Sequence, residues 1–244
     1  MPGEIEVTRP APHVARVSIA NPPSNAIGDA IRPVLIDALR ELDADTDIRA
    51  VILTGVGRIF CAGDDLREVG TRGARMAASL AEFQVLFDLI ETLRPPVIAA
   101  INGPAFGGGL ELALCCDIRL SAASARFAAS GVNIGLMASV VRLPRLIGRA
   151  RAKAMLLAGQ PIDAATALDY GLVTGVHEDA ALEAAALTLA AHIASRAPLS
   201  VEAAKRNVNG AGASDDMARL TASADHREAI AAFLEKRPPR FMRQ

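Results

Sequence analysis

Apolar and polar positions predict strands and helices in turn along the first half of the chain. The segment HVARVSIA, residues 13–20, alternates and is rich in β-branched residues, which is typical of a strand, and the turn-forming NPPSNAIG follows it. Over residues 30–45, apolar positions recur at helical spacing, with Pro33 near the first turn. Short apolar runs at 49–55 and 96–102 enclose a helical region at 76–93. Strand, helix, strand and helix in this order indicate parallel strand pairing.

The second half of the chain is mostly helical in pattern. Residues 117–129 predict two short strands, and residues 140–173 predict helices separated at Gly148, Gly159, Pro161 and Gly171. From residue 179 onward the sequence is alanine-rich and helical, with breaks at 197–198 and at NGAGAS, residues 209–214. We therefore expect an α/β core domain over residues 1–195 and a helical C-terminal region over residues 196–244.

Composition narrows the class of protein. The 244 residues are 51% hydrophobic, and 26 basic side chains face 27 acidic ones. Scattered basic residues, no Trp and a single Tyr disfavour nucleic-acid binding. The three cysteines have no metal-ligand spacing and read as reduced core residues, and no segment has the pattern of a signal peptide or membrane helix. We expect a cytoplasmic protein that binds neither nucleic acid nor a membrane.

Three consecutive glycines precede a lone acid in the apolar stretch INGPAFGGGLELALCC, residues 101–116. A helix that begins here has N–H groups without acceptors and a partial positive charge at that end, so it can bind a negative oxygen. Glu111 lies three residues after Gly108 and would share its helix face. The stretch can thus supply an oxyanion donor and a carboxylate to one pocket, although glycine triplets also serve packing and first-turn acids also complement the dipole.

A second candidate donor lies in GRIFCAGDDLREVG, residues 57–70, which follows an apolar strand. Gly63 can turn the chain sharply and expose the N–H of Asp64 before a short helical turn. Taken alone, the segment is as typical of an ordinary connection between a strand and a helix as it is of a donor site.

Together, IFCAGDDL (59–66) and INGPAFGGGLE (101–111) resemble the paired motifs of the crotonase superfamily, the enoyl-CoA hydratase and isomerase family. NPPSNAIG resembles the family's first loop, CDIRLSAASARFA its following strands and FLEKRPPRF its C-terminal ending, so the resemblance covers essentially the whole chain. It implies an α/β fold, a crotonase-like spiral of ββα units with a helical C-terminal trimerisation region. It also implies a homotrimer or dimer of trimers that acts on acyl-CoA in fatty acid metabolism. No resident cofactor is implied, because the substrate carries the CoA.

The resemblance also implies roles for individual residues. The N–H groups of Asp64 and Gly108 match the pair that holds the thioester oxygen of an acyl-CoA and stabilises its enolate. Glu111 matches the family's first acid/base glutamate. The positions that match CoA-binding residues are Ala62, Asp64, Asp65, Leu66, Arg67, Gly108, Phe233 and Lys236, of which the last two correspond to residues that reach the CoA of a neighbouring subunit.

Two positions depart from the family pattern. Gly131 stands where hydratases carry a second glutamate and isomerases often carry their base, so Glu111 would have to serve both proton transfers of a hydration. Asp64 occupies a position that is commonly small or apolar. We expect its side chain to point away from the pocket, because a carboxylate about 4 Å from an enolate would repel it by roughly 4 kcal/mol at an effective dielectric near 20.

The segment after Gly131 differs most, because the family's glycine-rich stretch is replaced by LMASVVRLP, residues 136–144. Polar side chains here can orient a water or a polar acyl group, or simply bind nearby backbone; they are Ser130, Asn133 and Ser139.

We expect an acyl-CoA enzyme, in first place an enoyl-CoA hydratase. Another enolate reaction, such as double-bond isomerisation, decarboxylation or thioester hydrolysis, stays open because of Gly131. A non-catalytic acyl-CoA-binding subunit is the alternative from another class, and Glu111 argues against it because a binding module needs no carboxylate there. The sequence contains neither HExxH nor GxSxG, which disfavours zinc-protease and serine-hydrolase chemistry.

Overall fold

The structure, a computed structural model, describes residues 3–210 and 214–244. The strands are β1 (Glu4–Ala11), β2 (Val14–Ala20), β3 (Ala50–Gly55), β4 (Val97–Ile101), β5 (Ala105–Phe106), β6 (Ile118–Ala122), β7 (Arg126–Ala128), β8 (Ile162–Asp163) and β9 (Gly175–His177). The helices are α1 (Ile31–Ala44), α2 (Leu66–Arg72), α3 (Met76–Thr92), α4 (Gly108–Cys115), α5 (Arg142–Ile147), α6 (Arg149–Ala158), α7 (Ala164–Asp169), α8 (Leu182–Ala194), α9 (Pro198–Val208), α10 (Ser214–Ala222) and α11 (Ala224–Leu234). Short 3-10 turns span Gly73–Arg75, Ser130–Ile134 and Asp179–Ala181.

The main sheet has the strand order β1-β2-β3-β4-β6-β9, and every pairing from β2 to β9 is parallel. The parallel arrangement predicted from the alternation of strands and helices is therefore confirmed. β1 was not predicted; it pairs antiparallel with β2 at the sheet edge, and most of its side chains are exposed, so it lacks the buried apolar positions that mark β2, β3 and β4. A smaller sheet has the order β5-β7-β8.

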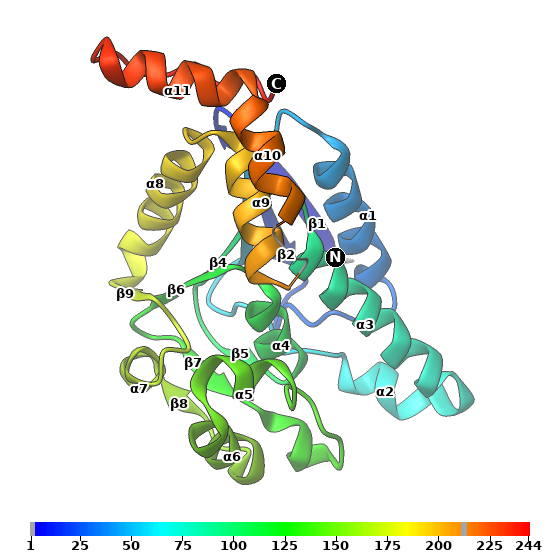
Figure 1. Cartoon of the computed structure of the whole chain (residues 1–244). Helices are drawn as coiled ribbons and strands as arrows, with labels where there is room; N and C mark the ends of the chain where they lie inside the picture. The colour runs from blue at the N-terminus through cyan, green and yellow to red at the C-terminus, as the bar shows by residue number, and fades with distance from the viewer. Residues whose placement is uncertain (1–2, 211–213) are drawn as a thin grey trace.

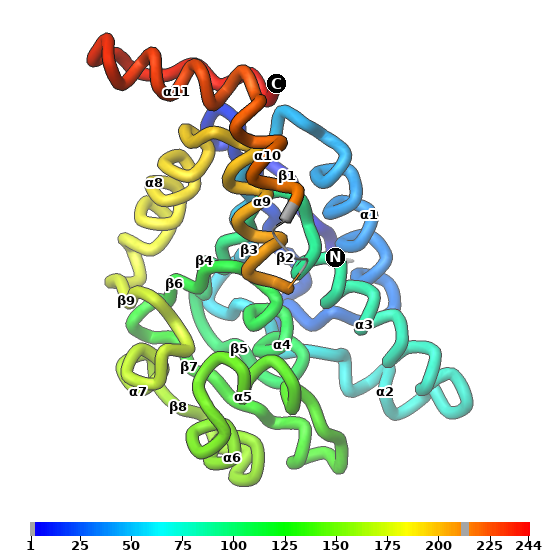
Figure 2. The backbone as a smooth tube through the Cα atoms, viewed as in Figure 1, coloured from blue at the N-terminus to red at the C-terminus, as the bar shows by residue number. Residues whose placement is uncertain are grey.

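Helices cover both sides of the main sheet, with α8 on one side and α1 and α3 on the other (Figure 1). The backbone trace shows α4 near the middle of the molecule, between α3 and α5 (Figure 2). Residues 109–115 of α4 are all buried. The glycine-rich stretch thus begins a helix enclosed by the rest of the fold, and α4 becomes a rigid support for any residue that it carries.

The other predicted elements are present within small shifts at their ends. Pro33 is the third residue of α1, where its missing N–H costs no intrahelical bond. α8 ends at residue 194 and α9 begins at Pro198, which agrees with the predicted break. Of the other predicted break, residues 211–213 lie outside the described residues. All three cysteines are free and buried, as expected for core thiols.

Ion pairs attach α9 to the core. Lys205 Nζ lies 2.7 Å from a carboxylate oxygen of Asp117, and Arg94 Nη1 lies 2.8 Å from Glu202 Oε1. α11, by contrast, extends away from the body of the molecule (Figure 1). The domain division at residues 195–196 stays a prediction. In the part of the chain that the structure describes, no helix is long and apolar enough to span a bilayer.

Candidate active site

The two glycine-containing segments meet backbone to backbone. Cys61 and Ala105 form an isolated parallel β-bridge, and the N–H of Phe106 donates to the carbonyl of Cys61 at 3.0 Å. Gly63 has φ +95°, and a Cβ built on it would lie 2.8 Å from the backbone nitrogen of Gly108. Only glycine combines this conformation with so close an approach. The two predicted motifs are therefore neighbours in space, and glycine allows their backbones to approach this closely because it has no side chain.

This contact places two backbone donors side by side. Gly107, with φ +52°, precedes the first residue of α4, so that the N–H of Gly108 belongs to the free N-terminal turn. A Cβ built on Gly108 would lie 3.6 Å from the backbone nitrogen of Asp64. Within the described residues, neither the Asp64 N–H nor the Gly108 N–H donates to another protein group. Both N–H groups are thus free to donate to one oxygen atom of a ligand, and their role as thioester donors stays a prediction.

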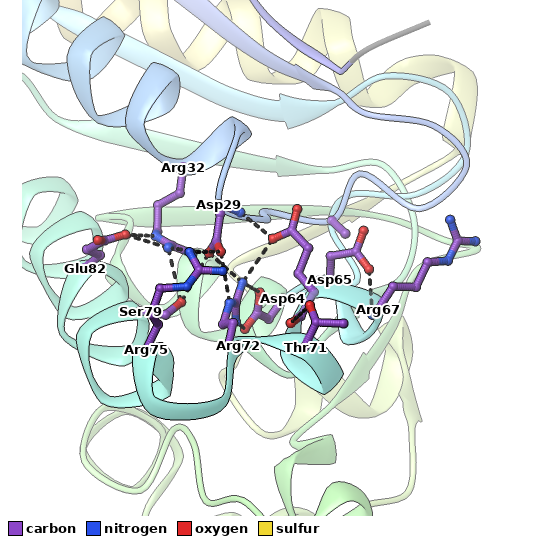
Figure 3. Close-up of polar contacts among 12 residues, drawn as sticks. Asp29, Arg32, Asp64, Asp65, Arg67, Thr71, Arg72, Arg75, Ser79 and Glu82 are labelled. Atoms are coloured by element: carbon purple, nitrogen blue, oxygen red, sulfur yellow. Dashed lines mark hydrogen bonds and ion pairs between the residues drawn. The ribbon is translucent and has the colours of Figure 1, made fainter.

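The side chain of Asp64 is directed at Arg72 (Figure 3). Both carboxylate oxygens accept from this guanidinium, with 2.8 Å between Arg72 Nη2 and Asp64 Oδ1. The Arg72 side chain has 0% exposure. Its positive charge therefore offsets the repulsion that an isolated Asp64 carboxylate would exert on an enolate.

Behind Asp64, the arginine belongs to a network of charges around two buried guanidinium groups (Figure 3). Arg72 Nη2 lies 2.8 Å from Asp29 Oδ1 and 3.1 Å from Glu68 Oε2, and Arg32, almost fully buried, binds Asp29 at 2.9 Å. The hydrogen bond from Arg72 is the largest influence on Asp29 and, with Arg32, holds its pKa below the usual range. The network ties the start of α1 to α2 and so fixes the loop that carries Asp64.

Glu111 is in the first turn of α4 and is buried, with 6% exposure. Its Oε1 accepts from Arg142 Nη1 at 2.9 Å. Its Oε2 is buried and has no hydrogen-bond partner. One carboxylate oxygen is thus held in place while the other is available for a proton or a ligand, as acid/base work requires.

Arg142 was not identified from the sequence. It is the first residue of α5, and besides Glu111 it binds Glu91 Oε2 at 2.7 Å and Asp88 Oδ1 at 2.9 Å, both on α3. The lone arginine in the apolar run VVRLP is the signal that could have drawn attention to it. α4, by carrying Glu111, is therefore linked to α3 and α5 through one guanidinium.

A cavity of about 410 Å³ opens beside Glu111. Arg142 and Ser139 also line it, and most of its other walls are apolar side chains, namely Leu80, Phe83, Phe87, Met137, Val140 and Val141. An apolar wall around one carboxylate is suited to an acyl chain whose reactive carbons approach Glu111.

Backbone fills the space next to Gly131. A Cβ built on this residue would lie 3.0 Å from the carbonyl oxygen of Leu136 and 3.2 Å from the nitrogen of Ala138. A glutamate here would need the 136–138 loop to move. A glycine at position 131 therefore matches the position of the 136–138 loop.

The structure separates the three polar candidates of this segment. Asn133 donates to the carbonyl of Gly159 at 3.0 Å and thus has a structural partner. Ser130 is partly exposed, near Gly107, and does not line the cavity beside Glu111. Ser139 does line it, and its buried Oγ has no partner.

A second cavity, of about 350 Å³, adjoins Asp64 and contains most of the predicted CoA-binding residues. Ala62, Asp64, Asp65, Leu66 and Arg67 all line it, opposite residues of the 21–26 loop. The Asp65 carboxylate caps α2 by accepting from the N–H of Arg67 at 2.9 Å, and the Arg67 side chain is exposed. These residues stay predicted CoA ligands, now placed around one cavity.

The remaining predicted residues are elsewhere. Phe233 is 83% exposed on α11, and Lys236 follows the end of that helix; neither lines the cavities beside Asp64 and Glu111. Their predicted role, on a neighbouring subunit, concerns an assembly and stays a prediction. A larger cavity, about 680 Å³, lies among α4, α5, α8 and α9, but it contains neither Glu111 nor the two free N–H groups.

Comparisons with known proteins agree with this geometry. The family model described as enoyl-CoA hydratase/isomerase matches residues 11–244. A probable enoyl-CoA hydratase of Bacillus subtilis is 37% identical, over 93% of this chain and 95% of its own. An (E)-benzylidenesuccinyl-CoA hydratase of Thauera aromatica is also 37% identical, over 99% of both chains.

Among solved structures, an enoyl-CoA hydratase from Bacillus anthracis superimposes with a TM-score of 0.93. It is 33% identical and covers 98% of this chain and 99% of its own. The fold predicted from the two motifs is confirmed by this similarity.

Proposed function

The chain belongs to the enoyl-CoA hydratase/isomerase family and is an enzyme of that type, and on this premise we propose that it adds water to 2-enoyl-CoA thioesters with Glu111 as its only acid/base carboxylate. The observation that carries this proposal is a buried carboxylate, Glu111, three residues after a free N–H donor. One of its oxygen atoms is bound by Arg142 and the other has no partner. Glu111 Oε2 and the N–H groups of Asp64 and Gly108 are all unpartnered within the described residues.

The proposed reaction begins when water attacks C3 of the enoyl group and gives one proton to Glu111. The electron pair of the double bond moves onto the thioester oxygen, which accepts hydrogen bonds from the N–H groups of Asp64 and Gly108. Each donor of this kind lowers a barrier by about 3–4 kcal/mol. Glu111 then delivers the proton to C2, the enolate returns to a thioester, and the carboxylate is regenerated. Because the proton taken from water is the one returned, a single carboxylate balances the reaction.

Other features complete the proposal. The cavity lined by Ala62 and Asp65–Arg67 would take the CoA moiety, and no resident cofactor takes part in these steps. A homotrimer or dimer of trimers is supported by the exposed apolar side chains of Ile230, Phe233 and Leu234 on the projecting α11. Unpaired cysteines support a cytoplasmic location. A role in fatty acid metabolism is proposed from the substrate class, the 2-enoyl-CoA thioesters.

The test is turnover of short, long and branched 2-enoyl-CoAs by the wild type, Glu111→Gln and the control Glu41→Gln, whose exposed side chain is on α1. We expect hydration by the wild type and the control, and a fall in kcat of about 10²- to 10⁴-fold for Glu111→Gln. The proposal fails if the wild type hydrates none of the panel. If the wild type also binds CoA thioesters no differently from Glu111→Gln, the result favours a non-catalytic acyl-CoA-binding protein.

A further inference from the structure

Two residues that line the same cavity each have a buried oxygen atom without a hydrogen-bond partner. Ser139 is 3% exposed, and its Oγ has no hydrogen-bond partner; Glu111 Oε2 is in the same condition. Both residues line the cavity of about 410 Å³. A buried hydroxyl or carboxylate oxygen without a partner is unfavourable, so native structures keep few of them, and those kept need an explanation. A ligand oxygen between the two atoms supplies one.

The backbone at Ser139 is also unusual. It has φ +60°, a left-handed conformation that serine adopts rarely, three residues before the start of α5. Its carbonyl accepts from the N–H of Leu143 at 3.3 Å, so the conformation belongs to the entry into α5. Strained residues of this kind persist where the surrounding structure holds them, often at ligand sites.

Most of the other polar groups of the cavity wall are already engaged, and Arg145 is exposed to solvent. The Arg142 guanidinium binds Glu111, Glu91 and Asp88, and Gln84 Nε2 donates to Asp88 at 2.6 Å. Within the described residues, Ser139 Oγ and Glu111 Oε2 are thus the buried lining atoms that have hydrogen-bonding capacity to spare.

We propose that Ser139 Oγ and Glu111 Oε2 together bind the oxygen that becomes the 3-hydroxyl group of the product. This inference rests on the proposed hydration. In the forward direction the bound oxygen is that of water, and in reverse it is the hydroxyl of a 3-hydroxyacyl-CoA. The serine hydroxyl orients that oxygen toward C3 without a net gain or loss of protons, while Glu111 takes the proton and returns it to C2. Ser139 thereby orients the oxygen in place of the second glutamate, because Gly131 stands at that glutamate's position and has no side chain.

The test compares the binding of 3-hydroxybutyryl-CoA and butyryl-CoA, which differ only by the hydroxyl, to the wild type, Ser139→Ala and the control Ser130→Ala. Isothermal titration is expected to show that the wild type prefers the hydroxylated ligand. Ser139→Ala should weaken that ligand about tenfold, the loss of one hydrogen bond, and leave butyryl-CoA unchanged. Ser130→Ala should change neither affinity.

Kinetics and thermal unfolding add a readout that separates function from structure. With a 2-enoyl-CoA, Ser139→Ala should lower kcat about tenfold and change KM less than about twofold. Its Tm should equal or exceed that of the wild type, because a buried hydroxyl without a partner destabilises the fold. A fall in Tm with weaker binding of both ligands would assign Ser139 a structural role and overturn the proposal.

The two proposals fail in different ways. If the wild type hydrates no 2-enoyl-CoA, the proposed function is wrong, and the binding ratio alone then decides the role of Ser139. A wild-type preference for 3-hydroxybutyryl-CoA that Ser139→Ala removes supports the subsite. A wild type without that preference, or a Ser139→Ala variant that keeps it, overturns the subsite even if hydration is observed.

Discussion

The donor pair and the acyl cavity are built by different means. The N–H groups of Asp64 and Gly108 are placed by contacts between backbone atoms, at glycines that permit no side chain. The cavity beside Glu111 is placed by side chains, with Arg142 joining α3, α4 and α5. The donor pair therefore depends on a few glycines in two short motifs. The acyl cavity depends on charged and apolar side chains from α3, α4, α5 and the loop before α5.

This difference decides how each region tolerates change. A backbone site is rigid and insensitive to most side-chain substitutions, but a single added methyl group can push its backbone segments apart. A side-chain site can be altered stepwise, and its members compensate for one another. Four variants or treatments follow, in order of decreasing effect.

The largest effect is expected for Gly109→Ala, at the residue next to the Gly108 donor. A Cβ on this residue would collide with the carbonyl group of Cys61, which is backbone and cannot turn aside. We expect a fall in kcat above about 100-fold, as for loss of an oxyanion donor, and a lower Tm. The matched control is Gly70→Ala in α2, where a Cβ meets no atom within 4 Å. A Gly109→Ala variant with wild-type kcat would contradict the backbone-built site.

Arg72→Met tests whether charge compensation matters at the donor pair. It leaves the Asp64 carboxylate without its partner, and repulsion of the enolate should lower kcat roughly 100-fold. Breaking a buried ion pair also destabilises the fold by about 3–5 kcal/mol, so activity is measured well below the Tm.

The double variant Asp64→Asn, Arg72→Met separates charge from structure. It carries neither charge, and the Asp64 N–H is retained, so most of the lost kcat should return. If kcat stays low in the double variant, Arg72 acts only as a structural support, and the compensation argument is wrong.

Arg142→Lys is expected to have a smaller effect, at the acyl cavity. A lysine cannot reproduce the three contacts of the guanidinium with Asp88, Glu91 and Glu111. Glu111 loses part of its orientation, and kcat should fall about tenfold while KM for the acyl-CoA is nearly unchanged. Arg149→Lys, exposed at the start of α6, serves as control. Equal kcat values for both variants would show that Arg142 does not position Glu111.

The smallest effect on activity is expected from treating the folded protein with a reagent that alkylates cysteine. Burial raises the pKa of Cys61 and of Cys116 to about 12, and it also raises the pKa of Cys115. All three thiols therefore stay protonated at pH 8 and react slowly with an alkylating reagent while the protein is folded. Mass spectrometry should show labelling only after denaturant is added. Rapid native labelling of Cys61 with loss of activity would mean that the donor region opens.

The same difference explains what could be predicted from the sequence. Gly63 lies in one short motif and Gly108 and Glu111 lie in another, and the resemblance of these two motifs to one family singled out the donor region and its carboxylate as candidates from the sequence. β3 and β4 were predicted because each is a short, mostly apolar run.

Arg142 and Arg72 were missed because their roles depend on tertiary contacts. Arg142 and Glu111 are 31 positions apart, and an arginine in an apolar run has no partner that local pattern can assign. Ser139 was only one of three open candidates, since burial and missing partners, rather than residue type, distinguish it from Ser130 and Asn133. β1 lacks a buried face and so lacks the pattern that marks β2, β3 and β4.

The central claim is that one carboxylate and two backbone donors are sufficient for hydration. It is tested most directly by incubating the wild type with a 2-enoyl-CoA in water labelled with heavy oxygen and deuterium, and analysing the product by mass spectrometry and NMR. The account predicts a 3-hydroxyacyl-CoA with one heavy oxygen on C3 and one deuterium on C2, and almost none with Glu111→Gln. Deuterium at C4 without oxygen uptake, or labelled free acid with released CoA, would show isomerisation or thioester hydrolysis and contradict it.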